Sequence, residues 1–305
     1  MRVVVGRSAG LSDTGRKRRQ NEDAYVCEPP LFAIADGMGG AQAGEVASRL
    51  AAAAFEEGAA AIQGEEGVAT VVRAANARIF ERAVHDPAVA GMGTTATVAV
   101  VDESAATVTI AHVGDSRAYL YRLGVLEQLT TDHSLVGELV RSGRLTEDEA
   151  AVHPHRSVIT RALGTDADVE VDTLTLEVAP GDLVLLCSDG LSAMLRDEEI
   201  VRVLGAADGA PNEAAAALVA AANAAGGEDN VTVVLFELVD ADVEAPPTLV
   251  PDVEEEPPEE MGPDGPTLED VRKHGAGKGS RWPALLLLLL ILAVAAFALW
   301  WSLVR

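Results

Sequence analysis

Four aspartates lie beside a glycine or within a glycine-rich turn, in a pattern that suggests a shared cation site. Three follow apolar strand-like runs and one lies in a glycine-rich turn before the last such run: Asp36, Asp115, Asp189 and Asp229. Strand ends can converge, and clustered carboxylates repel one another unless a cation compensates them. Oxygen ligands without clustered Cys or His favour Mg²⁺ or Mn²⁺ over zinc. Each Asp-Gly pair alone is also a common turn signal, so only the set predicts a metal site.

A second charged motif lies near the N-terminus. Between Asp13 and Asp23, four consecutive bases at 16–19 precede the acidic pair Glu22-Asp23. A solvated charged loop is the common explanation of such a run. In a chain with a formal charge of −25 and a pI near 4.5, however, phosphate chemistry would need a local group of cations such as this one.

Alternating strands and helices over residues 1–239 must position these acids. Residues 31–35 are typical of a strand buried on both faces, and the glycines after Asp36 allow the backbone to approach an ion closely. Helical patterns cover 43–61, 67–85, 197–204 and 211–225, and strands are expected at 93–101, 106–113, 118–122, 182–188 and 231–236. Residues 130–165 are less regular, and an insertion of this length tends to be functional.

Composition excludes several classes of protein. The acidic balance argues against a nucleic-acid partner, because there is no general excess of Lys and Arg to neutralise phosphates. The only cysteines, Cys27 and Cys187, form no disulfide framework and no zinc spacing, which suits a reducing cytoplasm. The N-terminal apolar run is too short for the core of a signal peptide, so no export signal is expected.

The C-terminal part changes composition sharply. Residues 240–270 hold twelve acids, seven prolines and no Lys or Arg, which predicts an extended acidic linker. A basic juxtamembrane segment follows at 271–283, and the apolar segment 284–304 is long enough to cross a bilayer as a transmembrane helix. Basic residues mark the cytoplasmic side of such a helix. We therefore expect a single-pass cell-membrane protein with residues 1–239 in the cytoplasm.

Six short motifs occur in order along residues 8–238. They are Arg18 with Asn21-Glu22-Asp23, Asp36-Gly37-Met38-Gly39-Gly40, Gly93-Thr94-Thr95, Gly114-Asp115-Ser116-Arg117, Ser188-Asp189-Gly190-Leu191 and Asp229-Asn230-Val231-Thr232. Together they resemble the motifs of PPM-type metal-dependent Ser/Thr protein phosphatases, the 2C class. The acidic linker and membrane tail resemble those of bacterial members that oppose Ser/Thr kinases.

The resemblance implies a fold and a set of roles. The fold is α+β, two stacked antiparallel β-sheets flanked by helices, an α-β-β-α sandwich with two or three Mn²⁺ or Mg²⁺ ions at one end. Arg18 binds phosphate, Asp36 bridges two ions, and the Gly37 carbonyl is a further ligand. The remaining metal residues are Glu22, Asp23, Asp115, Ser157, Asp189 and Asp229. An activated water then hydrolyses phosphoserine or phosphothreonine in proteins.

One residue departs from the pattern of some relatives. Met38 stands where some eukaryotic members have a His proposed as general acid, and Met cannot donate a proton. Two alternatives remain open beside the phosphatase reading: a pseudophosphatase that only binds phosphoproteins, and a hydrolase of small phosphoesters or nucleotides. The expected partners are phosphorylated proteins, including membrane-anchored Ser/Thr kinases, together with the membrane itself.

Overall fold

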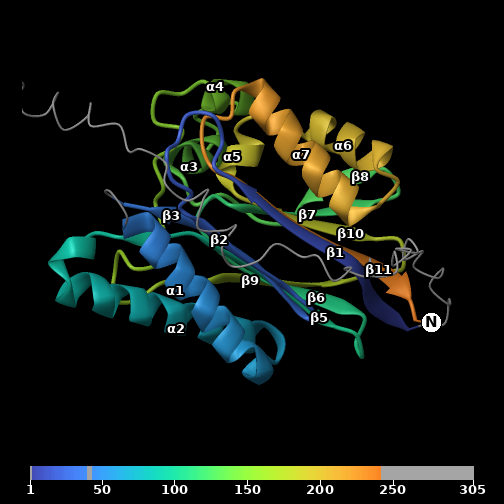
Figure 1. Cartoon of the computed structure of the whole chain (residues 1–305), viewed down its shortest axis with the longest axis horizontal. Helices are drawn as coiled ribbons and strands as arrows, with labels where there is room; N and C mark the ends of the chain where they lie inside the picture. The colour runs from blue at the N-terminus through green and yellow to red at the C-terminus, as the bar shows by residue number, and fades with distance from the viewer. Residues whose placement is uncertain (1, 40–42, 242–305) are drawn as a thin grey trace, which may run out of the picture. The chain divides into compact units, whose positions relative to one another are not determined.

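Two antiparallel sheets lie face to face in the computed structural model, which describes residues 2–39 and 43–241 (Figure 1). The five-stranded sheet has the order β1 (Val3–Asp13), β11 (Val231–Asp240), β10 (Leu183–Cys187), β7 (Arg117–Arg122), β8 (Val125–Gln128). The six-stranded sheet has the order β2 (Asp23–Glu28), β3 (Leu31–Met38), β5 (Ala96–Asp102), β6 (Thr107–Val113), β9 (Asp172–Glu177), with β4 (Gly93–Thr94) paired to β3.

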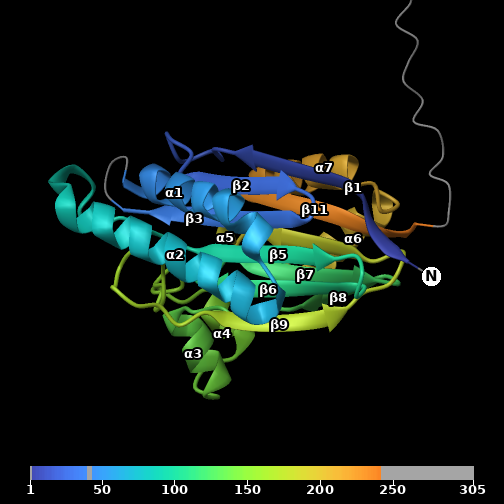
Figure 2. The same cartoon turned by 90° about the horizontal axis from the view of Figure 1, so that it is seen from below.

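Helices cover the outer face of each sheet. The six-stranded sheet carries α1 (Ala43–Gly58) and α2 (Gly64–His85), followed by the short 3₁₀ turns Ala59–Ala61 and Pro87–Val89 respectively. The five-stranded sheet carries α5 (Asp189–Ser192), α6 (Asp197–Ala206) and α7 (Pro211–Ala225). Two further helices, α3 (Leu135–Arg141) and α4 (Glu147–Ala151), belong to the insertion, which lies at the end of the sheets remote from the N-terminus (Figure 2).

Strand β3 shows why the sheets stack. Side chains alternate along a strand, so Phe32 and Ile34 enter the core between the sheets while Ala33 and Ala35 pack towards α1 and α2. Phe32 stacks on Phe236 of β11, with ring centroids 4.0 Å apart and an interplanar angle of 11°. A strand with both faces buried needs apolar residues at every position, which explains the continuous run at 31–35.

The first and last strands are neighbours. β1 pairs antiparallel with β11 from Val3 opposite Asp240 to Asp13 opposite Val231, with an irregularity between Val5 and Ser8. The backbone N–H of Ala241 extends this pairing by donating to the Arg2 carbonyl at 2.8 Å. The end of the ladder at Asp13 therefore lies next to the Asp229 turn, and its other end pairs Val3 with Asp240.

The α-β-β-α sandwich is confirmed. The predicted helices and central strands occur with small changes: α2 begins at Gly64, and the strand expected at 93–101 is divided into β4 and β5. Strands β1, β2, β8 and β9 were not predicted. Among the described residues no helix has the length and apolar character that a membrane span requires. Of the linker predicted at 240–270, only Asp240 and Ala241 are described, and the predicted basic segment and transmembrane helix lie outside the described residues.

Candidate active site

A cavity of about 330 Å³ lies where the predicted site residues meet. It is lined by Arg18, Glu22, Asp36, Gly37, Met38, Gly39, Asp115, Ser157, Ile159, Asp189 and Asp229. Eight of the nine predicted site residues are in this lining, although they come from every part of residues 18–229. The ninth, Asp23, is opposite Asp36 in the pairing of β2 with β3.

Asp36 is fixed near the end of β3 by its backbone. Its N–H donates to the hydroxyl of Thr95 at 3.0 Å, and its carbonyl accepts from the Thr95 N–H at 2.9 Å. Gly37 follows in a position that admits no side chain, because a Cβ there would lie 2.2 Å from the Gly44 carbonyl oxygen and 2.5 Å from that of Glu22. The glycine thus lets β3, the Glu22 loop and α1 come together beside the cavity.

Asp115 and Asp189 enter from neighbouring strands of the other sheet. Asp115 lies in the turn before β7, and Asp189 is the first residue of α5, directly after β10. Gly190 brings α5 against the turn before β11, since a Cβ there would be 1.9 Å from the Asn230 carbonyl oxygen. Strands β7 and β10 are paired, so the two carboxylates approach each other at one end of the sheet.

Arg18 and Asp229 form an ion pair at the rim. The Arg18 Nη2 atom lies 2.7 Å from Asp229 Oδ2, and its Nη1 atom lies 3.9 Å from Glu22 Oε2. The other Asp229 oxygen accepts from the Asn230 N–H at 2.8 Å. The Arg18 side chain is 49% exposed, so its guanidinium can reach solvent and a ligand in the cavity.

The acids beneath the cavity resist ionisation. Burial, and then the charges of neighbouring aspartates, raise the pKa of Asp36 well above its usual range. Burial also raises the pKa of Asp23 to about 7, although Thr232 donates a hydrogen bond of 2.6 Å to it. The same causes raise the pKa of Asp115 to about 8 and that of Asp189 to about 6. Such a cluster needs positive charge to be fully ionised at neutral pH.

The buried oxygens of this cluster fit a hard divalent cation. Asp23, Asp115 and Asp189 each bury one Oδ1 atom that has no hydrogen-bond partner among the described residues. Leaving such an atom unpaired is costly, and a metal ion would pair it. Within residues 2–39 and 43–241, no three acidic, His or Cys side chains already stand at metal-ligand spacing. These residues therefore fit a divalent cation by the chemistry of their carboxylate oxygens, and not because a set of ligands is already in place.

Asn230 is a site residue for which the sequence predicted no role. Its Oδ1 atom accepts from the Glu22 N–H at 2.8 Å, and its Nδ2 atom donates to the carbonyls of Thr14 and Gln20, each at 2.9 Å. One amide thus fixes both ends of the loop that carries Arg18. In the sequence, only its position directly after Asp229 indicates a role for Asn230, because its hydrogen-bond partners are about 210 residues away.

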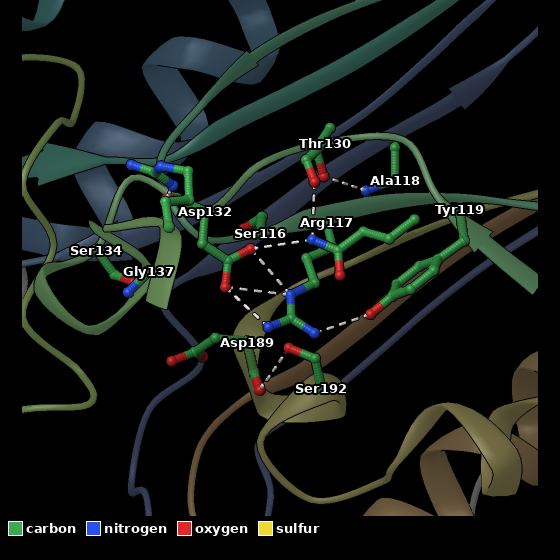
Figure 3. A network of polar contacts seen from close by, with 12 residues as sticks. Ser116, Arg117, Ala118, Tyr119, Thr130, Asp132, Ser134, Gly137, Asp189 and Ser192 are labelled. Atoms are coloured by element: carbon green, nitrogen blue, oxygen red, sulfur yellow. Dashed lines mark hydrogen bonds and ion pairs between the residues drawn. The ribbon is translucent and has the colours of Figure 1, made fainter. Parts of the chain in front are cut away.

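Arg117 supports the site from behind (Figure 3). Its guanidinium binds Asp132 at both ends, with Nε–Oδ1 at 2.9 Å and Nη2–Oδ2 at 2.8 Å, and donates to the Tyr119 hydroxyl at 3.0 Å. Planar two-point pairing of this kind is specific to Arg. It joins the start of the insertion to β7, two residues after Asp115.

Comparison with known proteins identifies the family. Residues 16–231 match the family model described as protein phosphatase 2C. The chain belongs to the protein phosphatase 2C family. The serine/threonine phosphatase stp of Listeria monocytogenes is 41% identical over 238 residues, which cover 74% of this chain and 93% of that protein. PstP of Mycobacterium tuberculosis is 43% identical over 243 residues, which cover 79% of this chain and 46% of that protein.

Solved structures of 2C-type phosphatases have the same fold. The crystal structure of Mycobacterium tuberculosis PstP/Ppp has a TM-score of 0.73 at 42% identity, covering 78% of this chain and 100% of that one. A PstP catalytic domain in complex with two manganese ions has a TM-score of 0.71 at 40% identity, with coverage of 78% and 100%. The sandwich of this chain is therefore the 2C fold, and a protein similar to it binds manganese.

Proposed function

We propose that this chain hydrolyses phosphoserine and phosphothreonine in proteins, with Mn²⁺ or Mg²⁺ as cofactor. The observation that carries the proposal is the cavity in which Arg18 faces a cluster of buried acids with unpartnered oxygens. Membership of the 2C family and similarity to named Ser/Thr phosphatases support the same reaction.

The proposed metal residues are Glu22, Asp23, Asp36, Gly37, Asp115, Ser157, Asp189 and Asp229, with Gly37 contributing its carbonyl. When bound, divalent ions supply a nucleophilic water at neutral pH and offset the charge of the phosphate. The four most buried of these acids ionise more readily in the presence of that charge, because the ions stabilise their carboxylates. They are Asp23, Asp36, Asp115 and Asp189. Their role is to hold ions, and the fixed backbone at Asp36 and Gly37 sets where they are held.

Arg18 is the proposed phosphate-binding residue. Its planar guanidinium suits two phosphate oxygens, and its exposed position lets it turn from Asp229 towards a ligand. No His, Lys, Tyr or Cys is among the described residues that line the cavity, and Met38 cannot donate a proton. We therefore assign protonation of the leaving alkoxide to water.

A phosphothreonine peptide and the full chain test the proposal. Phosphate release should require Mn²⁺ or Mg²⁺ and should fall by at least 100-fold in Asp36→Asn and Asp189→Asn. Asp168→Asn, at an exposed aspartate outside the cavity, is the matched control and should keep wild-type rates. Turnover without metal, or full turnover in both site variants, contradicts the proposal. Tight phosphopeptide binding without turnover in saturating Mn²⁺ would indicate a pseudophosphatase, and faster turnover of a nucleotide a small-molecule hydrolase.

We further propose that residues 284–304 anchor the enzyme in the cell membrane with residues 1–239 in the cytoplasm. The supporting features are the apolar length of this segment and the bases at 271–283. A tether raises the effective concentration of the catalytic domain near other membrane proteins. Membrane-anchored Ser/Thr kinases are accordingly the proposed partners.

A further inference from the structure

His133 lies where the insertion between β8 and β9 begins, against the turn that carries Asp115. The residue is 4% exposed. Its backbone N–H donates to the Gly114 carbonyl at 2.7 Å, and its ring Nδ1 accepts from the Gly114 N–H at 3.0 Å. His133 thus binds both polar backbone atoms of the residue before Asp115.

These contacts define the tautomer of the ring. Nδ1 faces a backbone N–H, which can only donate, so Nδ1 carries no proton and the neutral ring is protonated at Nε2. Nε2 lies 3.1 Å from Asp172 Oδ2, which accepts its proton, and also 3.1 Å from Arg161 Nη1, which cannot accept and instead donates to the other Asp172 oxygen at 2.6 Å. Burial lowers the pKa of His133, which favours the neutral ring.

The opposite side of the same turn is fixed by Thr95. Gly114 has φ +116°, and a Cβ there would lie 2.6 Å from the Thr95 Cγ2 atom. The Thr95 hydroxyl lies 2.7 Å from that of Ser116 and accepts from the Asp36 N–H. The turn is thus bound by Thr95 on one side and His133 on the other.

His133 also closes the base of the insertion. Its carbonyl accepts from the Thr160 N–H at 2.8 Å, and the next bond along joins the Leu135 N–H to the Val158 carbonyl at 2.9 Å. Ser157, which lines the cavity, lies just inside this closure. His133 therefore begins the segment that carries Ser157, contacts its other end at Thr160, and contacts the Asp115 turn.

We propose that His133 is a positioning residue for metal binding, which orients Asp115 through the two hydrogen bonds to Gly114. The inference rests on the proposed function, in which Asp115 and Ser157 are metal residues. His133 touches no reacting group itself. Removing the Nδ1 acceptor frees a buried N–H, and the Asp115 carboxylate then loses its fixed direction.

Two substitutions separate this role from general packing. In His133→Asn the amide oxygen takes roughly the place of Nδ1, whereas in His133→Gln the amide takes roughly the place of Nε2 and the Gly114 N–H loses its acceptor. Titration calorimetry of the full chain with Mn²⁺ should show binding weakened roughly 10- to 100-fold in His133→Gln, the factor typical when a group that orients a metal ligand is lost. Binding by His133→Asn should stay within about threefold of the wild type, because its acceptor is kept. His155→Gln, at an exposed position of the insertion, should match the wild type.

The melting temperature in chelator distinguishes positioning from stability. If both His133 variants lower it equally and bind Mn²⁺ as the wild type does, the residue is only structural and the inference fails. Should His133→Gln not fold, ¹⁵N NMR of the histidine rings in the wild type decides, since protonation of His133 Nδ1 at pH 7 also overturns the inference. Wild-type turnover that needs no metal would contradict the proposed function, while leaving the tautomer and the Mn²⁺ affinities as separate measurements.

Discussion

At the scale of single residues, the Arg18 guanidinium cannot bind both Asp229 and a substrate phosphate fully at the same time. In the structure its guanidinium is paired with Asp229, one of the proposed metal residues. Positive charge from an ion at Asp229 would repel Arg18 and free its planar face for phosphate. Metal binding and phosphate binding are therefore expected to favour each other at this residue.

Arg18→Lys should separate charge from shape. Lysine keeps the charge but cannot form the two-point contact, and one charge-assisted hydrogen bond contributes roughly 1.5–3 kcal/mol. We expect kcat/KM on a phosphothreonine peptide to fall roughly 10- to 100-fold at saturating Mn²⁺. Arg19→Lys, a neighbouring exposed arginine, is the control and should show no change. Unchanged kcat/KM in Arg18→Lys would mean that only the charge of the loop matters, and an equal loss in both variants would mean that the effect is not specific to Arg18.

The buried acids predict an unusual pH dependence of stability. Without metal, the pKa of Asp23 is raised to about 7 and that of Asp115 to about 8, above the value of about 3.9 in an unfolded chain. The native state then holds protons that the unfolded state has released, so stability is lost as pH rises through these values. Below about pH 6.5 the lowered pKa values of His112 and His133 act in the opposite direction. The window from about pH 6.5 to 8 therefore isolates the carboxylates.

Urea denaturation of the full chain in chelator should show the free energy of unfolding falling across that window. Excess Mn²⁺ should remove most of the fall, because the ion compensates the ionised carboxylates. A flat profile in chelator would contradict the raised pKa values, and a fall that Mn²⁺ leaves unchanged would contradict their role as metal residues.

Asp36, Asp115 and Asp189 could be predicted from the sequence because each follows a strand and has a glycine neighbour, and Asp229 because it lies in a glycine-rich turn before a strand. Their supporting contacts could not. Thr232 binds Asp23 across 209 residues, and Arg117 meets Asp132 through the antiparallel pairing of β7 with β8. A polar side chain in a strand or loop gives no local sign of such a partner.

At the scale of elements, α5 depends on a glycine. Gly190→Ala would bring a methyl group to 1.9 Å from the Asn230 carbonyl, so the turn before β11 must shift. We expect a loss of about 1–3 kcal/mol in the free energy of unfolding, together with weaker Mn²⁺ binding, because Asp189 and Asp229 flank the contact. Urea denaturation and metal titration measure the two effects. In Gly205→Ala of α6 the Cβ would lie 3.3 Å from the Tyr121 hydroxyl, at the end of a side chain that can shift slightly, so this variant should lose much less stability. A similar loss in both variants would contradict the argument.

The elements that could be predicted from the sequence are those with a strong apolar or helical pattern. Strand β3 and its continuous apolar run were evident, as were the long helices. Strand β1 has two glycines and a half-exposed face, so its sequence gives little sign of pairing. Strand β9 does carry a signal, the alternation of Thr and Leu from 173 to 176, but it follows an irregular insertion that conceals where the sheet resumes.

At the scale of the whole molecule, the cavity lies at one end of the catalytic domain, and the last strand, β11, ends at the other. Strand β11 starts beside Asp229 and ends at Asp240, which is opposite Val3. Ten residues of strand span about 33 Å. If residues 242–305 form a tether, the linker joins the domain at the end away from the cavity, which leaves the cavity free to meet large substrates.

Removing residues 271–305 tests the tether. Turnover of a soluble phosphopeptide should be unchanged, since no described site residue is lost. In cells, dephosphorylation of a membrane-anchored kinase should fall several-fold, roughly as the effective concentration falls, and the protein should leave the membrane fraction. Equal dephosphorylation by the shortened and full chains would contradict the role of the tether, and a comparable loss on the soluble peptide would indicate damage to the catalytic domain.

The pairing of the first strand with the last also bears on how the protein is made. β11 occupies an inner position of its sheet, between β1 and β10, yet it is synthesised last of the strands that the structure describes. The hydroxyls of Ser12 and Thr232, 2.7 Å apart, are separated by 220 residues. On the ribosome, β1 thus has no neighbour and the inner face opposite Phe32 stays uncovered until the domain is nearly complete. An unpaired strand and exposed apolar surface make the growing chain prone to aggregation until β11 is added.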